Sequence, residues 1–272
     1  MRKSRSFGAF TIAVLVALAF VPACIQTCES TASSSVMTSG TRAQMTAKAD
    51  GSGFTEVGVE LMVGGPLSNV YLSLDGDDQL VAAIGKQRQT LTRRTDVLGR
   101  VWYVGSIKGE QGDDDLVVSY QRTVDKGAPR SVVRMPAGFD VISPQPGMRV
   151  SRGNDDLVIA WDKPSSSDVM EVSLEGNCIR PFSSRLEVDK GQLLVPRATL
   201  GPPSSGAMQP MEPAGDSSGA KAEPQPVQVG EPECRVTARF RRRADGKVDP
   251  GYGQGGSITA EQVREVTFVS TP

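Results

Sequence analysis

Short runs of alternating apolar and polar residues fill most of this chain, and turn-forming residues separate them at regular intervals. Runs such as EVGVEL at 56–61, VYLSL at 70–74 and LVVSY at 116–120 have the period of two that a half-buried strand requires. The 272 residues include 29 Gly and 18 Pro, which favours many turns over long helices. The spacing predicts an all-β fold of the sandwich or barrel kind.

The runs fall into two sets, which suits a chain of this length because domains commonly hold roughly 100–200 residues. The first set ends with SVVRMP at 131–136, and FDVISP at 139–144 opens the second. We therefore expect two immunoglobulin-like β-sandwich modules, at 43–137 and 138–272. Residues 201–233 are rich in Pro, Gly and Ser and contain no Leu, Ile or aromatic residue, which predicts a disordered insertion in the second module.

The N-terminus has the layout of a secretory signal peptide. Arg2, Lys3 and Arg5 precede an apolar run at 7–21, which is shorter than the roughly 20 residues that span a bilayer comfortably. We expect residues 1–23 to be a signal peptide. The small polar residues that follow, up to residue 42, predict a flexible tether at 24–42.

The sequence Val21-Pro22-Ala23-Cys24 resembles a bacterial lipobox. The resemblance implies that Cys24 carries acyl chains such as palmitate through its sulfur and becomes the mature N-terminus. Each buried CH₂ contributes about 0.8 kcal/mol, so two or three chains anchor a protein stably. An ordinary signal peptide cut after Ala23 remains the alternative.

Two of the four cysteines lie in the body of the chain. An exported protein meets an oxidising compartment, so Cys178 and Cys234 are expected to form a disulfide, and two separate buried thiols are the alternative. No C-x-x-C motif supports a redox or zinc site. Cys28 is left without a partner if Cys24 is acylated, and otherwise could pair with it.

Histidine is absent, which excludes Ser-His-Asp and Cys-His catalysis and histidine-ligated zinc. The 30 basic residues balance 31 acidic residues, so bulk nucleic-acid binding is not expected. No cofactor motif stands in its required context. The G-x-G-x-x-G at 251–256 follows an arginine-rich run rather than an apolar strand, and S-x-x-K at 218–221 lies in the expected insertion.

Three similar segments, at 76–81, 112–117 and 153–158, combine Gly and Asp ahead of a strand-like run. Clustered carboxylates could bind calcium, but none matches the calcium-loop pattern, and we interpret them as turns that lead into strands. Thr259 and Gln262 match a helix capping box, which predicts one helical turn.

Four arginines, at 235, 239, 241 and 243, alternate with apolar residues. This pattern predicts a strand with one solvated face and one buried face. A basic stripe that grips an anionic polymer is the alternative.

Larger motifs resemble those of uncharacterised bacterial envelope lipoproteins. They are Phe139-x-Val-Ile-Ser-Pro144, Asp156-Leu157 with Trp161, the two body cysteines, and Arg243-x-x-Gly246-x-Val-Asp249-Pro250. The resemblance supplies no catalytic residue. It implies a non-catalytic lipoprotein of the outer membrane, or of the outer leaflet of the inner membrane, that binds an envelope protein or a polysaccharide or serves a structural role. A carboxylate-based glycan hydrolase needs no histidine and remains an alternative, as does a carbohydrate-binding module with a row of exposed aromatic residues.

Overall fold

The computed structural model describes residues 29–109, 112, 114–201 and 233–272. They form strands and two 3₁₀ turns, η1 (Ser33–Ser35) and η2 (Thr38–Gly40), and they contain no α-helix. The prediction of an all-β fold is therefore confirmed. The strands before residue 138 are β1 (Glu29–Ala32), β2 (Thr41–Ala49), β3 (Phe54–Val63), β4 (Val70–Ser73), β5 (Gln79–Ile84), β6 (Gln87–Thr90), β7 (Thr92–Thr95), β8 (Val101–Lys108), β9 (Asp115–Gln121) and β10 (Ala128–Arg134). Those after it are β11 (Val141–Ser143), β12 (Arg149–Ser151), β13 (Leu157–Trp161), β14 (Val169–Glu175), β15 (Phe182–Leu186), β16 (Gln192–Val195), β17 (Cys234–Asp245) and β18 (Gly256–Thr271).

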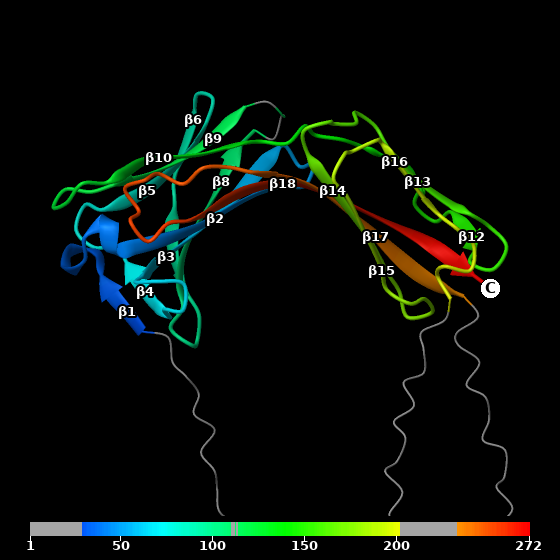
Figure 1. The fold of residues 1–272 in the computed structure, drawn as a ribbon, viewed down its shortest axis with the longest axis horizontal. Coiled ribbons are helices and arrows are strands. Elements are labelled where there is room, and N and C mark those ends of the chain that lie inside the picture. Colours follow the sequence, from blue (N-terminus) through cyan, green and yellow to red (C-terminus); the bar gives the residue numbers. More distant parts are fainter. Residues whose placement is uncertain (1–28, 110–111, 113, 202–232) are drawn as a thin grey trace, which may run out of the picture.

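One large sheet runs through the whole molecule and gives it the shape of an arch (Figure 1). Its strand order is β1-β4-β3-β2-β18-β17-β14-β15, with β8 and β7 continuing from β3 and with β12 beside β18. A four-stranded sheet, β10-β9-β5-β6, packs on it at one end, and a three-stranded sheet, β11-β13-β16, packs on it at the other. We call these ends the first lobe and the second lobe.

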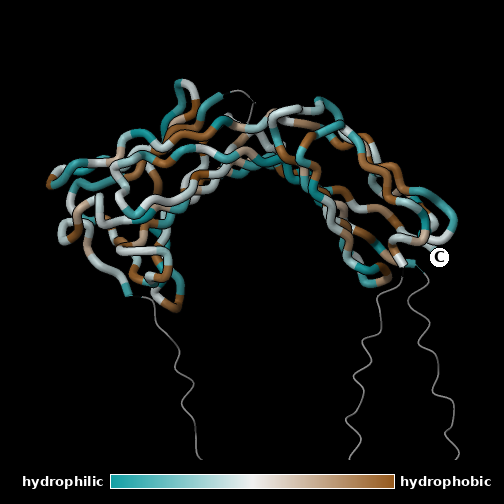
Figure 2. Tube along the Cα trace, in the orientation of Figure 1, coloured by the Kyte–Doolittle hydropathy of each residue, from teal (hydrophilic) through white to brown (hydrophobic). Residues whose placement is uncertain are grey.

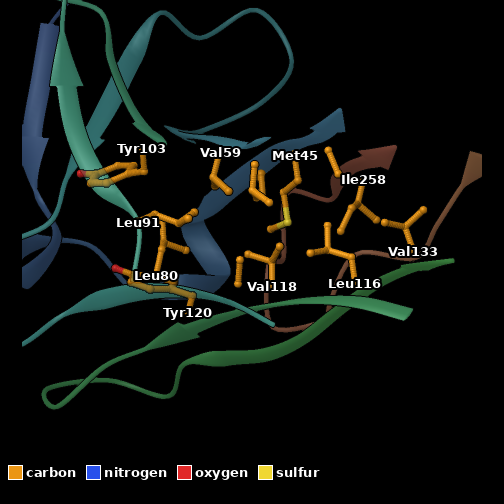
Figure 3. Close-up of a cluster of buried hydrophobic side chains, with 14 of the residues drawn as sticks. Met45, Val59, Leu80, Leu91, Tyr103, Leu116, Val118, Tyr120, Val133 and Ile258 are labelled. Atoms are coloured by element: carbon orange, nitrogen blue, oxygen red, sulfur yellow. The ribbon is translucent and has the colours of Figure 1, made fainter. Parts of the chain in front are cut away.

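Both hydrophobic cores lie on the same face of the large sheet. In β18, Ile258 and Ala260 belong to the core of the first lobe (Figure 3), whereas Val266 and Phe268 belong to the core of the second. All four positions are even, and successive strand residues point to opposite faces. The other face, which we call the outer face, is therefore continuous between the lobes, and the hydrophobic segments gather inside each lobe (Figure 2).

The two lobes share their C-terminal strands. The second core begins with Phe139, close to the expected division at 137/138. The first core, however, also takes in Tyr252, Ile258 and Ala260, which come more than 100 residues later. The β17–β18 pair thus belongs to both lobes, an arrangement that a simple split of the chain does not describe.

The predicted tether at 24–42 is wrong for residues 29–42. Strand β1 pairs in parallel with β4, and β2 begins at Thr41. The small polar side chains are hydrogen-bonded: the hydroxyl groups of Ser33 and Ser34 each donate to Asp75 at 2.6 Å. These serines close turns rather than leave the backbone free. Cys24, Cys28 and the signal peptide lie outside the described residues.

The predicted helical turn at 259–262 is also wrong. These residues lie in β18, in register with β17 on one side and with β2 on the other. Pairing on both sides outweighs a local capping signal. The predicted insertion at 201–233 falls, apart from its two end residues, outside the described residues.

The Gly/Asp segments at 76–81 and 153–158 form turns that lead into strands β5 and β13, as predicted, whereas part of the segment at 112–117 lies outside the described residues. Among the described residues, no group of three or more acidic or cysteine side chains is placed to hold a metal ion. The glycines of the G-x-G-x-x-G segment allow close backbone approach: a Cβ atom would lie 2.4 Å from the Ser39 oxygen at Gly253 and 1.9 Å from the Ala43 oxygen at Gly256.

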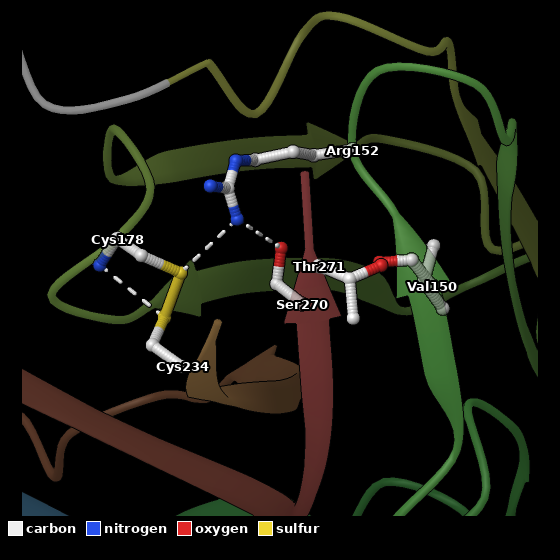
Figure 4. Close-up of a disulfide and its surroundings, with 6 residues drawn as sticks. All are labelled: Val150, Arg152, Cys178, Cys234, Ser270 and Thr271. Atoms are coloured by element: carbon white, nitrogen blue, oxygen red, sulfur yellow. Dashed lines mark hydrogen bonds between the residues drawn. A yellow bond between two sulfur atoms is a disulfide. The ribbon is translucent and has the colours of Figure 1, made fainter. Parts of the chain in front are cut away.

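The Cys178–Cys234 disulfide is present, as predicted (Figure 4). It joins the segment after β14 to the first residue of β17, and both cysteines are buried. The Arg152 guanidinium lies 3.5 Å from both the Cys178 sulfur and the Ser270 hydroxyl. A closed loop with a sequence separation of 56 residues contributes about 4 kcal/mol in the chain-entropy account.

Candidate functional site

Two adjoining hollows form a trough on the outer face of the first lobe. The larger has a volume of about 570 Å³ and the smaller about 210 Å³, and they share Glu56 and Ser106. Ligand sites commonly occupy about 300–1,000 Å³. The residues that line the trough are Lys48, Asp50, Ser52, Phe54, Glu56, Val57, Gly58, Gln89, Thr92, Arg94, Val104, Gly105 and Ser106.

The register of four strands builds the floor of the trough. Thr46 of β2 pairs with Gly58 of β3, which pairs with Val104 of β8, which in turn pairs with Thr92 of β7. Gly58 has no side chain to fill the centre of this row. A Cβ atom at Gly58 would lie 3.1 Å from the Thr46 hydroxyl oxygen. The hollow therefore depends on a glycine in the middle of a strand, a position where glycine weakens the strand itself.

An aromatic side chain stands near each end of the trough. Phe54 is 48% exposed and lines the smaller hollow. Trp102 is half-buried and pairs in register with Arg94, which lines the larger hollow. Because Phe54 pairs with Lys108, six residues after Trp102 on β8, the two aromatic residues are about 20 Å apart along the strands.

The ionic groups of the trough balance one another. Lys48 and Arg94 supply two positive charges, and Asp50 and Glu56 supply two negative charges. Lys48 and Glu56 are register partners on neighbouring strands. Hydrogen bonds from Ser52 lower the pKa of Asp50, which keeps it ionised. The trough is therefore strongly polar but has no formal net charge, which suits a neutral ligand rich in hydroxyl groups.

The four arginines at 235, 239, 241 and 243 of β17 lie as the alternation predicts, on the solvated face of a strand whose other face is buried. Three of them form ion pairs, Arg239 with Glu265 at 2.7 Å, Arg241 with Glu171 at 3.2 Å and Arg243 with Asp245 at 2.8 Å. Neighbouring carboxylates thus offset much of the positive charge. This arrangement favours a solvated, ion-paired surface over a basic stripe for an anionic polymer.

Sequence reasoning missed Arg242, which lies between these arginines on the buried face. Its side chain is fully buried and pairs with Asp189. It also donates hydrogen bonds to the Ala137 oxygen at 2.6 Å and to the Lys163 oxygen at 2.8 Å. Since all these partners are protein groups, Arg242 serves the fold. The signal in the sequence was its even position within the alternating run.

A separate hollow, of about 540 Å³, lies between the segments at 37–39, 125–129 and 249–251. Its two acids are already engaged. Asp125 accepts hydrogen bonds from the Thr38 amide and the Arg122 guanidinium, and Asp249 accepts them from the amides of Arg130 and Gly251. These carboxylates hold loops together, so the trough is the stronger candidate.

The pKa shifts of four carboxyl groups bear on the hydrolase alternative. That reaction needs a general acid whose pKa is raised. Among the described residues, hydrogen bonds lower the pKa values of Asp50, Asp75, Asp125 and Glu233, and every resolved carboxyl shift runs in this direction.

No family model matches the chain, and no curated protein matches it. Among solved structures, one match is SGBP-B of the Bacteroides ovatus mixed-linkage glucan utilization locus in complex with a mixed-linkage heptasaccharide. It is 11% identical, with 89% of this chain and 67% of that chain covered and a TM-score of 0.19. A likeness at that score carries no argument about fold or function. In the part of the chain that the structure describes, no helix is long and apolar enough to cross a bilayer.

Proposed function

We propose that this protein is a non-catalytic envelope lipoprotein that holds a neutral polysaccharide chain in the trough of the first lobe. The observation that carries the proposal is a charge-balanced, elongated hollow floored by Gly58, with Phe54 and Trp102 about 20 Å apart near its ends. Aromatic faces pack against apolar CH groups, while the polar groups between them can hydrogen-bond to hydroxyl groups.

Anchoring through acylated Cys24 is part of this proposal and rests on the lipobox-like sequence. It places the body at the outer membrane or at the outer leaflet of the inner membrane. Subcellular fractionation of wild type beside Cys24→Ser tests it. The variant should leave the membrane fraction, and a variant that stays there contradicts the anchor.

Affinity electrophoresis through gels that contain soluble neutral or anionic polysaccharides tests the trough. Wild type should be retarded by at least one neutral polysaccharide, and Gly58→Gln, which fills the floor, should migrate freely. Ser173→Gln, on the outer face of the second lobe, is the matched control and should be retarded like wild type. Equal retardation of Gly58→Gln, or retardation by anionic polymers alone, contradicts the proposal.

An assay for new reducing ends separates binding from hydrolysis. Incubation of the retarding polysaccharide with the protein should release none. A protein-dependent increase would establish the hydrolase alternative instead.

A further inference from the structure

Two loops of the first lobe carry aliphatic side chains that are wholly exposed. Leu67, in the loop between β3 and β4, and Val97, in the loop between β7 and β8, are each 100% exposed, and Leu98 beside it is 46% exposed. Single exposed aliphatic residues are common on protein surfaces. These two loops, however, lie at the same end of the lobe, which makes them a pair.

The strand pairing fixes this placement. Strand β3 ends at Val63 and β8 begins at Val101, and the two strands are antiparallel with Val59 opposite Tyr103. The end of β3 and the start of β8 therefore lie side by side, at the same end of the sheet. In Figure 1 this end of the sheet is at the bottom of the first lobe, and Figure 2 shows a hydrophobic loop there.

The chain enters the fold at that same end. Glu29, the first residue of β1, is in register with Val70, which directly follows the β3–β4 loop. Cys24 comes five residues before Glu29 in the sequence. Five residues of extended chain reach at most about 17 Å. An acyl group on Cys24 would thus keep the end that carries Leu67 and Val97 close to the bilayer.

Hydrogen bonds hold both loops in place. The Asp96 carboxylate accepts hydrogen bonds from the amides of Leu98 and Arg100, at 2.9 Å and 3.0 Å. In the other loop, the amide of Ser68 donates a hydrogen bond to the Gly65 oxygen at 3.0 Å. The hydroxyl oxygen of Ser68 accepts one from the Val70 amide at 3.2 Å. The two tips are therefore shaped turns that present aliphatic groups outward.

We propose that these two loops rest on the lipid bilayer, with Leu67, Val97 and Leu98 in its interfacial layer beside the acylated N-terminus. The inference rests on the anchor of the proposed function. The two loops would add a second contact with the membrane beside the acyl anchor. Binding to the membrane interface becomes stronger as more apolar area is buried in it. Because β3 and β8 rise from these loops, the trough then extends away from the membrane, with Trp102 nearer to the bilayer and Phe54 farther from it.

Quenching of tryptophan emission by brominated phospholipid tests the contact. Val97→Trp and Leu67→Trp are placed in the lipidated protein in vesicles, and the wild-type signal, which comes from Trp102 and Trp161, is subtracted. The control is Leu194→Trp, because Leu194 is 56% exposed on β16 in the second lobe. We expect brominated lipid to reduce the added emission at positions 97 and 67 at least twofold and to leave that at position 194 unchanged.

Equal quenching at positions 97, 67 and 194 overturns the proposal, as does the absence of quenching at 97 and 67. Cross-linking between two copies at position 97 without quenching would assign the loops to a protein contact and also overturns it. The anchor is scored separately, by the acyl mass on the N-terminal peptide. If that mass is missing, residues 1–23 are replaced by a hexahistidine tag, which attaches the protein to vesicles that contain a nickel-chelating lipid. The same quenching comparison then decides whether the loops touch the bilayer.

Discussion

The carboxylate of Asp189 lies 2.6 Å from the guanidinium of Arg242, and both side chains are fully buried. The same carboxylate accepts a hydrogen bond from the indole of Trp161 at 2.7 Å. Arg242 also reaches the Ala137 oxygen, in the connection between the lobes. Its register partner Gln262 donates to the neighbouring Pro136 oxygen at 3.2 Å. Hydrogen bonds from Arg242, which is held in a buried ion pair, and from Gln262 thus fasten the connection to the two strands that both lobes share.

Loss of this ion pair should destabilise the protein strongly. Arg242→Met leaves the charge of Asp189 buried without its partner, and such changes cost about 3–5 kcal/mol. Urea unfolding followed by circular dichroism measures the change. Arg239→Met, which removes an exposed ion pair with Glu265, is the control and should cost at most about 1 kcal/mol. Similar values for the two variants would contradict this role for Arg242.

The last glycine of the G-x-G-x-x-G segment should tolerate no side chain. Gly256 has a φ of +148°, and a Cβ atom there would lie 1.9 Å from the Ala43 oxygen of its parallel partner strand. Gly256→Ala should therefore lower the free energy of unfolding by about 2 kcal/mol or more, because it combines strain with a clash. Gly65→Ala, which meets nothing within 4 Å, should stay within about 0.5 kcal/mol of wild type. An unchanged midpoint for Gly256→Ala would argue against the close approach of β18 to β2.

Acid should weaken the N-terminal turn through Asp75. Hydrogen bonds from the Ser33 and Ser34 side chains lower the pKa of this carboxyl from 3.8 to about 2. A lowered pKa means that the carboxylate contributes its stability above pH 4, and that this contribution is lost as the pH falls from about 4 to 2. NMR titration of the Asp75 side-chain carbonyl should give a midpoint near 2 in wild type and a higher one in Ser33→Ala. A wild-type midpoint near 3.8 would show that the serines do not hold this carboxylate.

Alternation along single strands made much of the fold predictable. The burial of β3 and of β17 follows the alternating sequence, because one face of each strand packs on a core and the other meets water. The disulfide followed from the compartment and the count of cysteines. The order of residues 29–42 could not be foreseen, since the partners of Ser33 and Ser34 lie more than 40 residues away at Asp75.

The trough could not be predicted from sequence patterns for the same reason. Its floor joins Gly58 on β3 to Val104 on β8, two strands that are far apart in the sequence, and the β7–β8 hairpin then adds Thr92. The sequence pattern singles out neither Gly58 nor Trp102. Only the register of the sheet places both on the outer face. The loops that carry Leu67 and Val97 likewise become a pair only when β3 and β8 are placed side by side.

Isothermal titration calorimetry tests the central claim most directly. Mature protein is titrated with an oligosaccharide prepared from whichever neutral polysaccharide retards it in gels, in parallel with Trp102→Ala. The account predicts one site per chain in wild type and an oligosaccharide that is recovered intact. The affinity of the variant should be at least about fivefold weaker, because truncation of a tryptophan at the centre of a contact costs more than about 1 kcal/mol. Equal affinities for the two proteins, or shortening of the oligosaccharide during the titration, would contradict it.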